Sequence, residues 1–208
     1  MKTSERITEE ALTLFSQNGY NGTSVRQIAD AVGIKDASLY KHFKSKQEIL
    51  ESIIELIKNH ISDLSDRMRI PNKTTAASDE EFYGTIDDAS LKKLTREAFL
   101  FYLTDPYISG FWRLAHMEQY GNKEIYRLFR QIFIEDAVSY LTKLFEGMSA
   151  RGVISSADPG AAAMSYYAPF FLLLTQYESQ KEKTDEALAL LDKQTDEFLR
   201  LYGNKGGN

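Results

Sequence analysis

Residues 23–50, TSVRQIADAVGIKDASLYKHFKSKQEIL, decide the fold of this chain. Ser24 and Gln27 have the three-residue spacing of a capping box, which satisfies free backbone N–H groups at the start of a helix. The apolar residues that follow share one helical face, and Gly33, a residue typical of a helix end, closes the run. These apolar residues are Val25, Ile28, Ala29 and Val32. The stretch therefore predicts a helix of about two and a half turns followed by a glycine turn.

A second helix, short and polar, is expected over residues 36–43. Its apolar side is formed by Ala37, Leu39 and Phe43. Ile34 can seal the preceding turn against the core. Polar side chains at the remaining positions can donate hydrogen bonds to phosphates and base edges, so we expect this helix to read a DNA major groove. The remaining positions are Ser38, Tyr40, Lys41 and His42.

Further helices are expected on both sides of this pair. Ser45 and Glu48 repeat the capping-box spacing and predict a helix over residues 46–69. Upstream, an apolar stripe ends at Gly19; its members are Ile7, Ala11, Leu14 and Phe15. Four helices in roughly seventy residues leave little room for a sheet, so the predicted fold class is all-α.

A longer set of positions in this region has a fixed spacing: Phe15, Gly19-Tyr20, Thr23 to Ala29, Gly33, Leu39-Tyr40, His42-Phe43, Lys46 and Leu50. This spacing resembles the DNA-binding head of the tetracycline-repressor (TetR) family. Its hallmarks are a Phe and a Gly-aromatic pair closing the first helix, then Thr-Ser/Thr-Val-Arg-x-Ile-Ala, then Leu-Tyr-x-His-Phe-x-x-Lys-x-x-Leu. A match of this length at fixed spacing is a specific signal.

The resemblance covers residues 4–57 and implies an organisation for the whole chain. It implies a helix-turn-helix DNA-binding domain at residues 1–50, with a connecting helix at 46–69. A larger helical domain at residues 70–203 would bind a ligand and dimerise. The tail at 204–208 is polar and Gly-rich, and we expect it to be disordered.

Carried over position by position, the resemblance also implies which residues face the DNA. Thr23 is included because backbone phosphates approach a helix N-terminus. The full set is Thr23, Ser24, Arg26, Lys35, Asp36, Ala37, Ser38, Tyr40, Lys41, His42 and Lys46.

Several of these residues also have a purely structural alternative. Thr23 can simply precede the helix cap, and Ser24 can be only the cap. Arg26 can be a solvated charge, and Tyr40 can pack in the core. Lys46 falls in the first turn of its helix, where the macrodipole disfavours a cation, and a phosphate partner would explain that placement.

Asp36 departs from the otherwise basic surface, because phosphates repel a carboxylate. We interpret it as the cap of the second helix, in preference to an acceptor for a cytosine amino group. His42 is interpreted as a hydrogen-bond donor or packing residue, because His60 and His116 are distant in sequence and the chain has no cysteine. We expect no metal site and no cofactor.

Composition and charge limit the partners. The chain has 208 residues, of which 43% are hydrophobic, enough for one or two domains with a sizeable core. Residues 1–50 carry seven Lys/Arg and six Asp/Glu, whereas the whole chain has a net charge of −5. An acidic bulk argues against non-specific coating of nucleic acid. A small basic head makes few phosphate contacts, so useful affinity requires two heads acting together.

Several protein classes are not expected. An enzyme would need a nucleophile–base pair, a metal cluster or a glycine-rich phosphate loop, and the chain has three scattered histidines and none of these patterns. The opening MKTSER has no apolar signal segment, so a cytoplasmic location is expected. The longest weakly polar run, residues 161–174, is too short to span a bilayer and is interpreted as a buried helix.

Helix signals continue after a linker-like stretch at residues 70–89, where Ser78 and Glu81 can start one short turn. One helix should end before Asp105-Pro106, and the next should begin at that pair. A third, long helix should begin at an Asn122 cap and end at Gly152. The last two helices are expected at about 159–180 and 183–202, after Asp158-Pro159. The first of them is apolar nearly all round, so a partner subunit is expected on one side. In the family it resembles, the last two helices form a four-helix bundle with their two-fold mates, and residues 159–202 are therefore the expected dimer interface.

Pro169 inside the penultimate helix is expected to kink it near Ser165 and open a space among aromatic side chains. The expected lining of this ligand pocket is Phe99, Tyr102, Tyr107, Phe111, Trp112, His116, Met117, Tyr120, Phe129, Phe133, Tyr166, Tyr167 and Phe170. The alternative is that these residues are plain core. Three nearby charged residues, Arg113, Arg130 and Glu118, are interpreted as solvated.

The functional hypothesis is a homodimeric transcriptional regulator, most simply a repressor, that binds a pseudo-palindromic operator. A small hydrophobic or aromatic molecule would release it by favouring a different separation of the two heads. The alternative is a DNA-binding regulator whose larger domain is only a dimerisation or protein-partner module.

Overall fold

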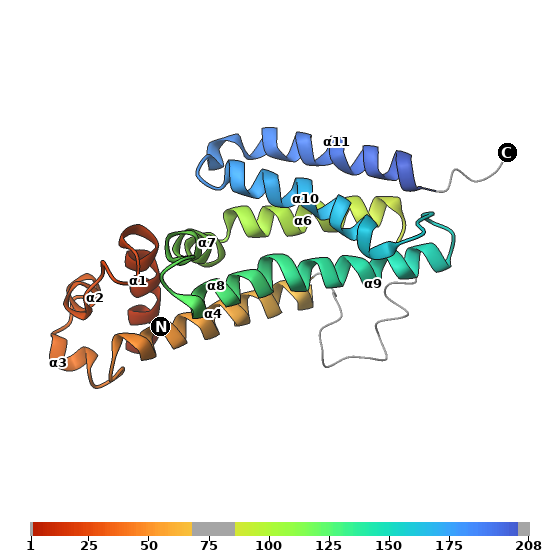
Figure 1. The fold of residues 1–208 in the computed structure, drawn as a ribbon. Helices are drawn as coiled ribbons and strands as arrows, with labels where there is room; N and C mark the ends of the chain where they lie inside the picture. Colours follow the sequence, from red (N-terminus) through yellow and green to blue (C-terminus); the bar gives the residue numbers. More distant parts are fainter. Residues whose placement is uncertain (1, 68–85, 204–208) are drawn as a thin grey trace. The chain divides into compact units, whose positions relative to one another are not determined.

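The computed structural model describes residues 2–67 and 86–203. Helices make up almost all of both ranges (Figure 1). Within the described residues, the only strand-like feature is an isolated antiparallel bridge between Ile154 and Gly203. The predicted all-α class is confirmed. The elements are α1 Thr3–Asn18, α2 Val25–Val32, α3 Asp36–Leu39, α4 Lys46–Arg67, α6 Asp88–Thr104, α7 Pro106–Glu118, α8 Lys123–Arg130, π-helix η1 Gln131–Glu135, α9 Asp136–Ala150, α10 Pro159–Tyr177, 3₁₀ turn η2 Lys181–Lys183 and α11 Thr184–Tyr202.

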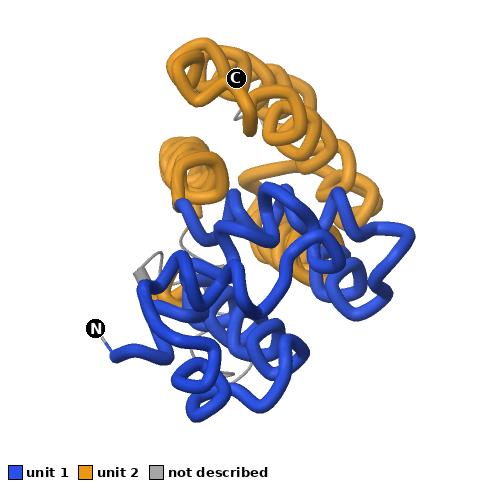
Figure 2. Tube along the Cα trace, turned by 90° about the vertical axis from the view of Figure 1, so that its left-hand side faces the viewer, with its two compact units in different colours: residues 1–62, 106–130 blue, residues 63–105, 131–208 orange. Residues whose placement is uncertain are grey.

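The described residues fall into two compact units (Figure 2). Unit 1 combines the N-terminal region up to Ser62 with the segment Pro106–Arg130. Unit 2 takes the described residues between Asp63 and Asp105 and those from Gln131 onward. The segment 106–130, far from the head in sequence, is thus part of the same compact body as the head. The division by function, into residues 1–50 and 70–203, stays a prediction.

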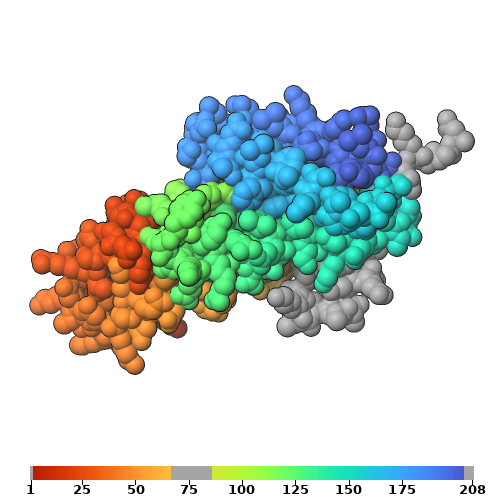
Figure 3. Space-filling view, viewed as in Figure 1, coloured from red at the N-terminus to blue at the C-terminus, as the bar shows by residue number. Residues whose placement is uncertain are grey.

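Unit 1 is built around α1, which packs against both α2 and α7. In the space-filling view, red α1 lies directly beside green α7 (Figure 3). Ile7, Ala11 and Phe15 on α1 are fully buried. Leu12 of α1 faces Gly110 of α7, where an added Cβ would lie at ordinary contact distance, 3.5 Å from Leu12 Cγ. The apolar stripe of α1 therefore covers two partners from distant parts of the chain.

Local sequence signals set the helix ends of unit 1. Ser24 caps α2, accepting from the Gln27 N–H, while the Gln27 side chain accepts from the Ser24 N–H at 2.7 Å. Gly33 has φ +76° and ψ 34°, the left-handed conformation that ends a helix and that glycine adopts without strain. The capping box and the glycine turn are confirmed.

The second helix is shorter than the pattern predicts. α3 ends at Leu39, and residues 40–43 continue in tight turns, with the His42 N–H donating to the Leu39 carbonyl. Glu48 caps the next helix in a variant of the expected box, since its carboxylate accepts from the Lys44 N–H at 2.6 Å. Ser45 Oγ accepts from the Glu48 N–H, as the spacing predicts.

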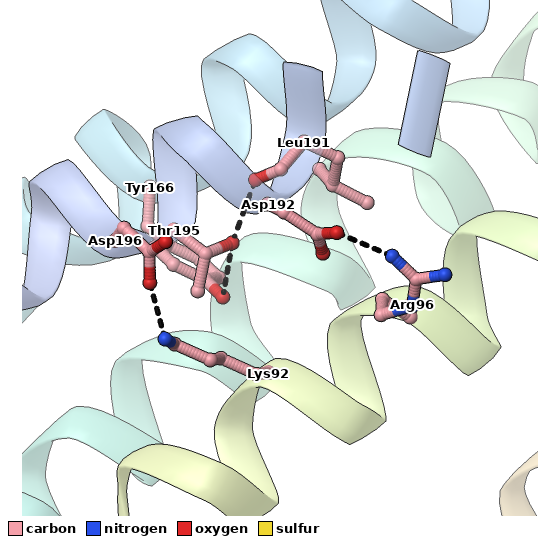
Figure 4. Close-up of polar contacts among 7 residues, drawn as sticks. All are labelled: Lys92, Arg96, Tyr166, Leu191, Asp192, Thr195 and Asp196. Atoms are coloured by element: carbon pink, nitrogen blue, oxygen red, sulfur yellow. Dashed lines mark hydrogen bonds and ion pairs between the residues drawn. The ribbon is translucent and has the colours of Figure 1, made fainter. Parts of the chain in front are cut away.

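Unit 2 is a layered helical body in which α10 packs on α9, α6 and α11, and α11 also packs on α6. Figure 4 shows the α6–α11 seam. Its outer edge carries two ion pairs, Lys92 with Asp196 and Arg96 with Asp192. The two pairs match residues four apart on each helix, which is the register of two antiparallel helices.

Buried hydroxyl groups lie behind this seam. Tyr166 Oη, from α10, is 2.6 Å from Thr95 Oγ1 of α6 and 3.4 Å from Thr195 Oγ1 of α11. Each threonine hydroxyl also donates to a carbonyl of its own helix. Three helices are thus joined by one satisfied polar cluster inside an apolar core.

The long helix predicted after Asn122 contains a π turn. Asn122 Oδ1 accepts from the N–H groups of Glu124 and Ile125, so the predicted cap is confirmed. The helix then runs through α8, η1 and α9, and Gly152 follows its end with φ +71°. A π turn widens the backbone. The Tyr167 hydroxyl donates to the Phe133 carbonyl of η1 at 2.6 Å.

Several other predictions have a defined outcome. Asp158 caps α10 with Pro159 at its first turn, as predicted. α10 includes Pro169, and the kink predicted near Ser165 stays a prediction. The predicted turn at Ser78–Glu81 and the predicted disordered tail lie outside the described residues. Among the helices that are described, none has both the length and the apolar character needed to cross a bilayer.

Candidate nucleic-acid interface

The polar side chains around α3 are displayed outward from a buried anchor. Leu39 is fully buried, and α3 packs against α2. Tyr40 is 51% exposed, so the core-packing alternative for it is wrong. The remaining predicted DNA-facing residues of α2, the turn and α3 are exposed or, for Ser38, half-buried; they are Ser24, Arg26, Lys35, Asp36, Ala37, Ser38, Lys41 and His42. The structure therefore brings most of the predicted contacts to one exposed helix-turn-helix.

Thr23 is an exception. Its side chain is only 1% exposed, and its hydroxyl donates to the carbonyls of Gly19 at 3.0 Å and Leu14 at 3.3 Å. The hydroxyl is committed within the protein, so Thr23 has the structural role that was its alternative. We remove it from the set of candidate DNA contacts.

Lys46 has partners inside the protein. Its Nζ donates to the Tyr20 carbonyl at 2.8 Å and the Thr23 carbonyl at 3.0 Å, and lies 4.3 Å from the centre of the Tyr20 ring. A cation near a helix N-terminus is therefore explained by loop carbonyls and an aromatic face. These internal partners explain the placement without a phosphate, and the DNA contact expected for Lys46 stays a prediction.

The predicted capping role of Asp36 is also wrong. Lys35 occupies the N-cap position of α3, with no side-chain capping bond, and Asp36 is the first helical residue. A carboxylate there still interacts favourably with the N-terminal end of the helix dipole. Asp36 therefore remains an exposed acidic group at the candidate interface.

Glu118 was absent from every predicted site, and its interpretation as a solvated charge is wrong. It is 7% exposed, and its Oε1 accepts from the Tyr20 N–H at 2.8 Å. Gly19 has φ +77°, and a Cβ on it would lie 3.1 Å from Glu118 Oε1. One sequence signal pointed to this role: Glu118 is the last residue of α7, where the helix dipole disfavours a carboxylate.

The Tyr20 side chain joins a second chain of contacts. Its hydroxyl donates to Gln47 Oε1 at 3.3 Å, and Gln47 Nε2 donates to Glu124 Oε2 at 3.0 Å. Burial, followed by the nearby carboxylates of Glu124 and Glu118, raises the pKa of Tyr20. Helices α7 and α8 thus approach the loop after α1 from sequence positions about a hundred residues away.

Eight of the thirteen predicted pocket residues lie in two aromatic clusters. In unit 1, the α7–α8 cluster joins Trp112, His116 and Phe129, with ring centres 4.8–5.2 Å apart. The other unit 1 residues of the predicted pocket lie elsewhere. Phe111 is fully buried, Tyr107 packs on His60 and donates to Glu9, and Met117 and Tyr120 are exposed, Tyr120 at 93%.

In unit 2, the α6–α10 cluster contains five predicted residues, Phe99, Tyr102, Phe133, Tyr167 and Phe170. The ring centre of Phe170 lies 5.3 Å from those of Phe99 and Tyr167 and 6.2 Å from that of Tyr102. The ring centres of Tyr102 and Phe133 are 5.3 Å apart. Burial, followed by the charge of Asp136, raises the pKa of Tyr102 to about 12. Tyr166 belongs to the buried hydroxyl cluster behind the seam. The single pocket expected from sequence therefore stays a prediction.

No group of three His, Asp or Glu side chains in the part of the chain that the structure describes is arranged to hold a metal ion.

Comparison with known proteins bears directly on the helix-turn-helix. The family described as "Bacterial regulatory proteins, tetR family" matches residues 7–53. A curated relative, the biofilm operon icaADBC HTH-type negative transcriptional regulator IcaR of Staphylococcus aureus, is 30% identical over 122 residues. The match covers 59% of this chain and 59% of that relative.

Two solved structures share the fold. A TetR-family transcriptional regulator from Mesorhizobium loti has 21% identity and a TM-score of 0.69, and the match covers 97% of this chain and 96% of that one. SmeT of Stenotrophomonas maltophilia, solved with triclosan, has 20% identity and a TM-score of 0.69, with 98% and 93% covered. Residues 7–53 therefore carry the DNA-binding region of the tetR family of bacterial regulatory proteins, and the resemblance expected from the sequence is confirmed there.

Proposed function

We propose that this protein is a homodimeric, ligand-responsive transcriptional regulator, most simply a repressor, that acts in the cytoplasm. Two α3 helices would bind a pseudo-palindromic operator, and a small hydrophobic or aromatic molecule would release them. The observation that carries the proposal is the exposed polar surface from Lys35 to His42, held outward on the buried Leu39.

The proposed contacts divide into two kinds. Ser38, Tyr40 and His42 have hydrogen-bonding groups suited to base edges or phosphates. Arg26, Lys35 and Lys41 supply positive charge for the backbone. Asp36 at the same surface repels phosphate, so few net charges favour binding and one head alone binds weakly. Two heads spaced by one helical turn of DNA, roughly 34–36 Å, or a multiple of it, would add their contacts.

The dimer would form through α10 and α11. Met164 and Leu172 of α10 are 64% and 63% exposed, and the smaller residues Ala161 and Ala168 are exposed on the same helix. Their spacing of three, four and four residues is that of one helical face. α11 adds the exposed Leu190 and Leu201. Apolar side chains at helical spacing are well suited to pack against a second copy of the same helices.

The effector would bind among aromatic side chains of the larger domain. The α6–α10 cluster combines apolar rings with the hydroxyl of Tyr102, a polar group that can orient a ligand. An uncharged aromatic or apolar compound fits this lining best. A larger domain that only dimerises would give no ligand-induced rise in melting temperature.

A direct test uses duplexes enriched by the wild-type protein from a random-sequence pool. The double variant Tyr40→Ala/Lys41→Ala should lose the selected duplex by at least tenfold in Kd. Lys143→Ala, which removes an exposed charge from α9, is the matched control and should bind normally. No enrichment by the wild-type protein, or unchanged binding by the double variant, would refute the proposal.

A further inference from the structure

We infer that Glu118 is a positioning residue for operator binding, although it lies outside the segment 7–53 that the family match covers. Its carboxylate holds the loop from which α2 begins, and so fixes the exposed helix-turn-helix. The inference rests on the proposed function and adds to it a residue of α7.

Two charged side chains hold the loop between α1 and α2 at Tyr20, one at its N–H and the other at its carbonyl. The N–H of Tyr20 donates to Glu118 Oε1 at 2.8 Å, and the carbonyl of Tyr20 accepts from Lys46 Nζ at 2.8 Å. A carboxylate from α7 and an ammonium group from α4 therefore hold the two backbone polar groups of the same residue. Hydrogen bonds to charged groups are shorter and stronger than bonds between neutral groups.

The constraint continues to the start of α2. Lys46 Nζ also binds the Thr23 carbonyl, and the Thr23 hydroxyl donates back to the carbonyls of Gly19 and Leu14. Ser24 comes next and caps α2. A displacement of Tyr20 is therefore passed toward Ser24, because Tyr20 and Thr23 share Lys46 Nζ as a partner and Thr23 directly precedes Ser24.

Glu118 occupies a position that is unfavourable for a carboxylate. It is buried, and it lies at the C-terminal end of α7, where the helix dipole repels negative charge. The site is nevertheless shaped for it: Cβ atoms on Gly19 and Gly121 would lie 3.1 Å and 3.3 Å from its two carboxylate oxygens. The helix dipole and the burial both disfavour an acid here, whereas the bond to the Tyr20 N–H favours one.

The experiment compares full-length Glu118→Ala, Glu118→Asp and Glu118→Gln with the wild-type protein. Glu118→Ala removes the acceptor, Glu118→Asp keeps the charge but shortens its reach, and Glu118→Gln keeps an acceptor of the same length. Glu146→Ala, which removes an exposed carboxylate from α9, is the matched control. Binding to a duplex that the wild-type protein selected from a random pool is measured at several salt concentrations. Amide exchange at Tyr20 is measured by NMR.

The expected result for Glu118→Ala and Glu118→Asp is a loss of about tenfold in affinity, faster exchange at Tyr20, and a dependence of log K on log salt that is shallower by about one phosphate contact per head. Glu118→Gln should bind within about threefold of the wild-type protein, and Glu146→Ala should be unchanged. If Glu118→Ala does not fold, Glu118→Asp and the Gln rescue decide the same point. A purely structural role would lower the active fraction and leave the salt dependence of the folded fraction unchanged.

The inference is overturned if Glu118→Asp exchanges faster at Tyr20 yet binds the selected duplex with wild-type affinity and salt dependence. It is also overturned if Glu118→Gln loses as much affinity as Glu118→Ala. If the wild-type protein enriches no duplex at all, the proposed function fails, and this inference fails with it.

Discussion

The hydroxyl of Tyr167 donates to the carbonyl of Phe133 at 2.6 Å, within the only π turn among the described residues. The two residues are 34 positions apart and lie in different helices of unit 2. Burial, followed by the neighbouring Tyr102, raises the pKa of Tyr167 well above its ordinary value. The hydroxyl therefore stays protonated and serves as a donor over the physiological range.

Tyr167→Phe should leave the buried Phe133 carbonyl without this donor. We expect a loss of about 1–3 kcal/mol in the free energy of unfolding, because a buried acceptor left unsatisfied costs more than an average hydrogen bond contributes. Urea denaturation measures the change. Tyr120→Phe, at an exposed position, is the control, and an equal effect of both variants would contradict the role given to Tyr167.

The α6–α11 seam has half-exposed ion pairs at its edge and buried hydroxyl groups behind them, and the two should contribute differently to stability. Removing both ion pairs with Lys92→Met/Arg96→Met should change stability by less than about 1 kcal/mol per pair, and less again in 1 M salt, because these side chains are about half-exposed. Thr95→Val should cost about 1–3 kcal/mol at any salt, since Tyr166 loses a buried partner. Urea denaturation at low and high salt distinguishes the two. A larger effect from the ion pairs would reverse this ranking.

Replacing Gly19, Gly33 or Gly110 with alanine should change the free energy of unfolding by different amounts. Gly19 has φ +77° and ψ 164°, a region that essentially only glycine occupies, and its added Cβ meets Glu118; Gly19→Ala should cost about 1–3 kcal/mol. Gly33 is left-handed but has open space around it, so Gly33→Ala should cost about 1–2 kcal/mol.

Gly110 lies inside α7, and its Cβ would make only ordinary contacts with Leu12. Gly110→Ala should therefore stabilise the protein by up to about 1 kcal/mol through helix propensity. Urea midpoints rank the three variants, and a destabilised Gly110→Ala would show that α1 and α7 pack more tightly than these contacts indicate.

Tyr102 should lose its phenolic proton only at a pH well above that of an exposed tyrosine. Its pKa in the folded protein is about 12, against about 10 in an unfolded chain, because burial and then Asp136 disfavour the phenolate. A raised folded pKa contributes stability below pH 10, which is lost as the pH rises toward 12. Absorbance at 295 nm of the wild-type protein and Tyr102→Phe should therefore agree up to about pH 11 and differ only above it. A difference centred near pH 10 would place Tyr102 in solvent.

The proposed dimer predicts a change in oligomeric state. Met164→Glu/Leu172→Lys places charges on the exposed face of α10, and we expect monomers by analytical ultracentrifugation and loss of tight operator binding. Tyr120→Lys, at another exposed aromatic residue, should leave the oligomeric state unchanged. If the α10 double variant remains a dimer, the interface lies elsewhere.

The helices and their ends were predictable from sequence because caps, glycines and apolar spacing act within a few residues. Ser24 with Gln27, Gly33, Asn122 and Asp158 with Pro159 all mark the ends they predict. The exposed surface of α3 follows in the same way, since the burial of Leu39 turns its neighbours outward. The length of α3 was less predictable, because the N–H groups of Lys41 and His42 bond to carbonyls three residues back instead of four, at little energetic difference.

Sequence by itself thus determined an all-helical chain with an outward-facing helix-turn-helix of the tetR family. Only the tertiary structure decided that Glu118 is buried against Tyr20 and that Lys46 binds carbonyls 23 and 26 residues away. It also decided that Trp112 and Phe129 belong to one aromatic cluster and Tyr102 and Phe170 to another. The physical reason is that these partners meet only when distant helices pack. The local sequence around a carboxylate or an ammonium group does not show whether packing will leave it solvated or bring it to a backbone group.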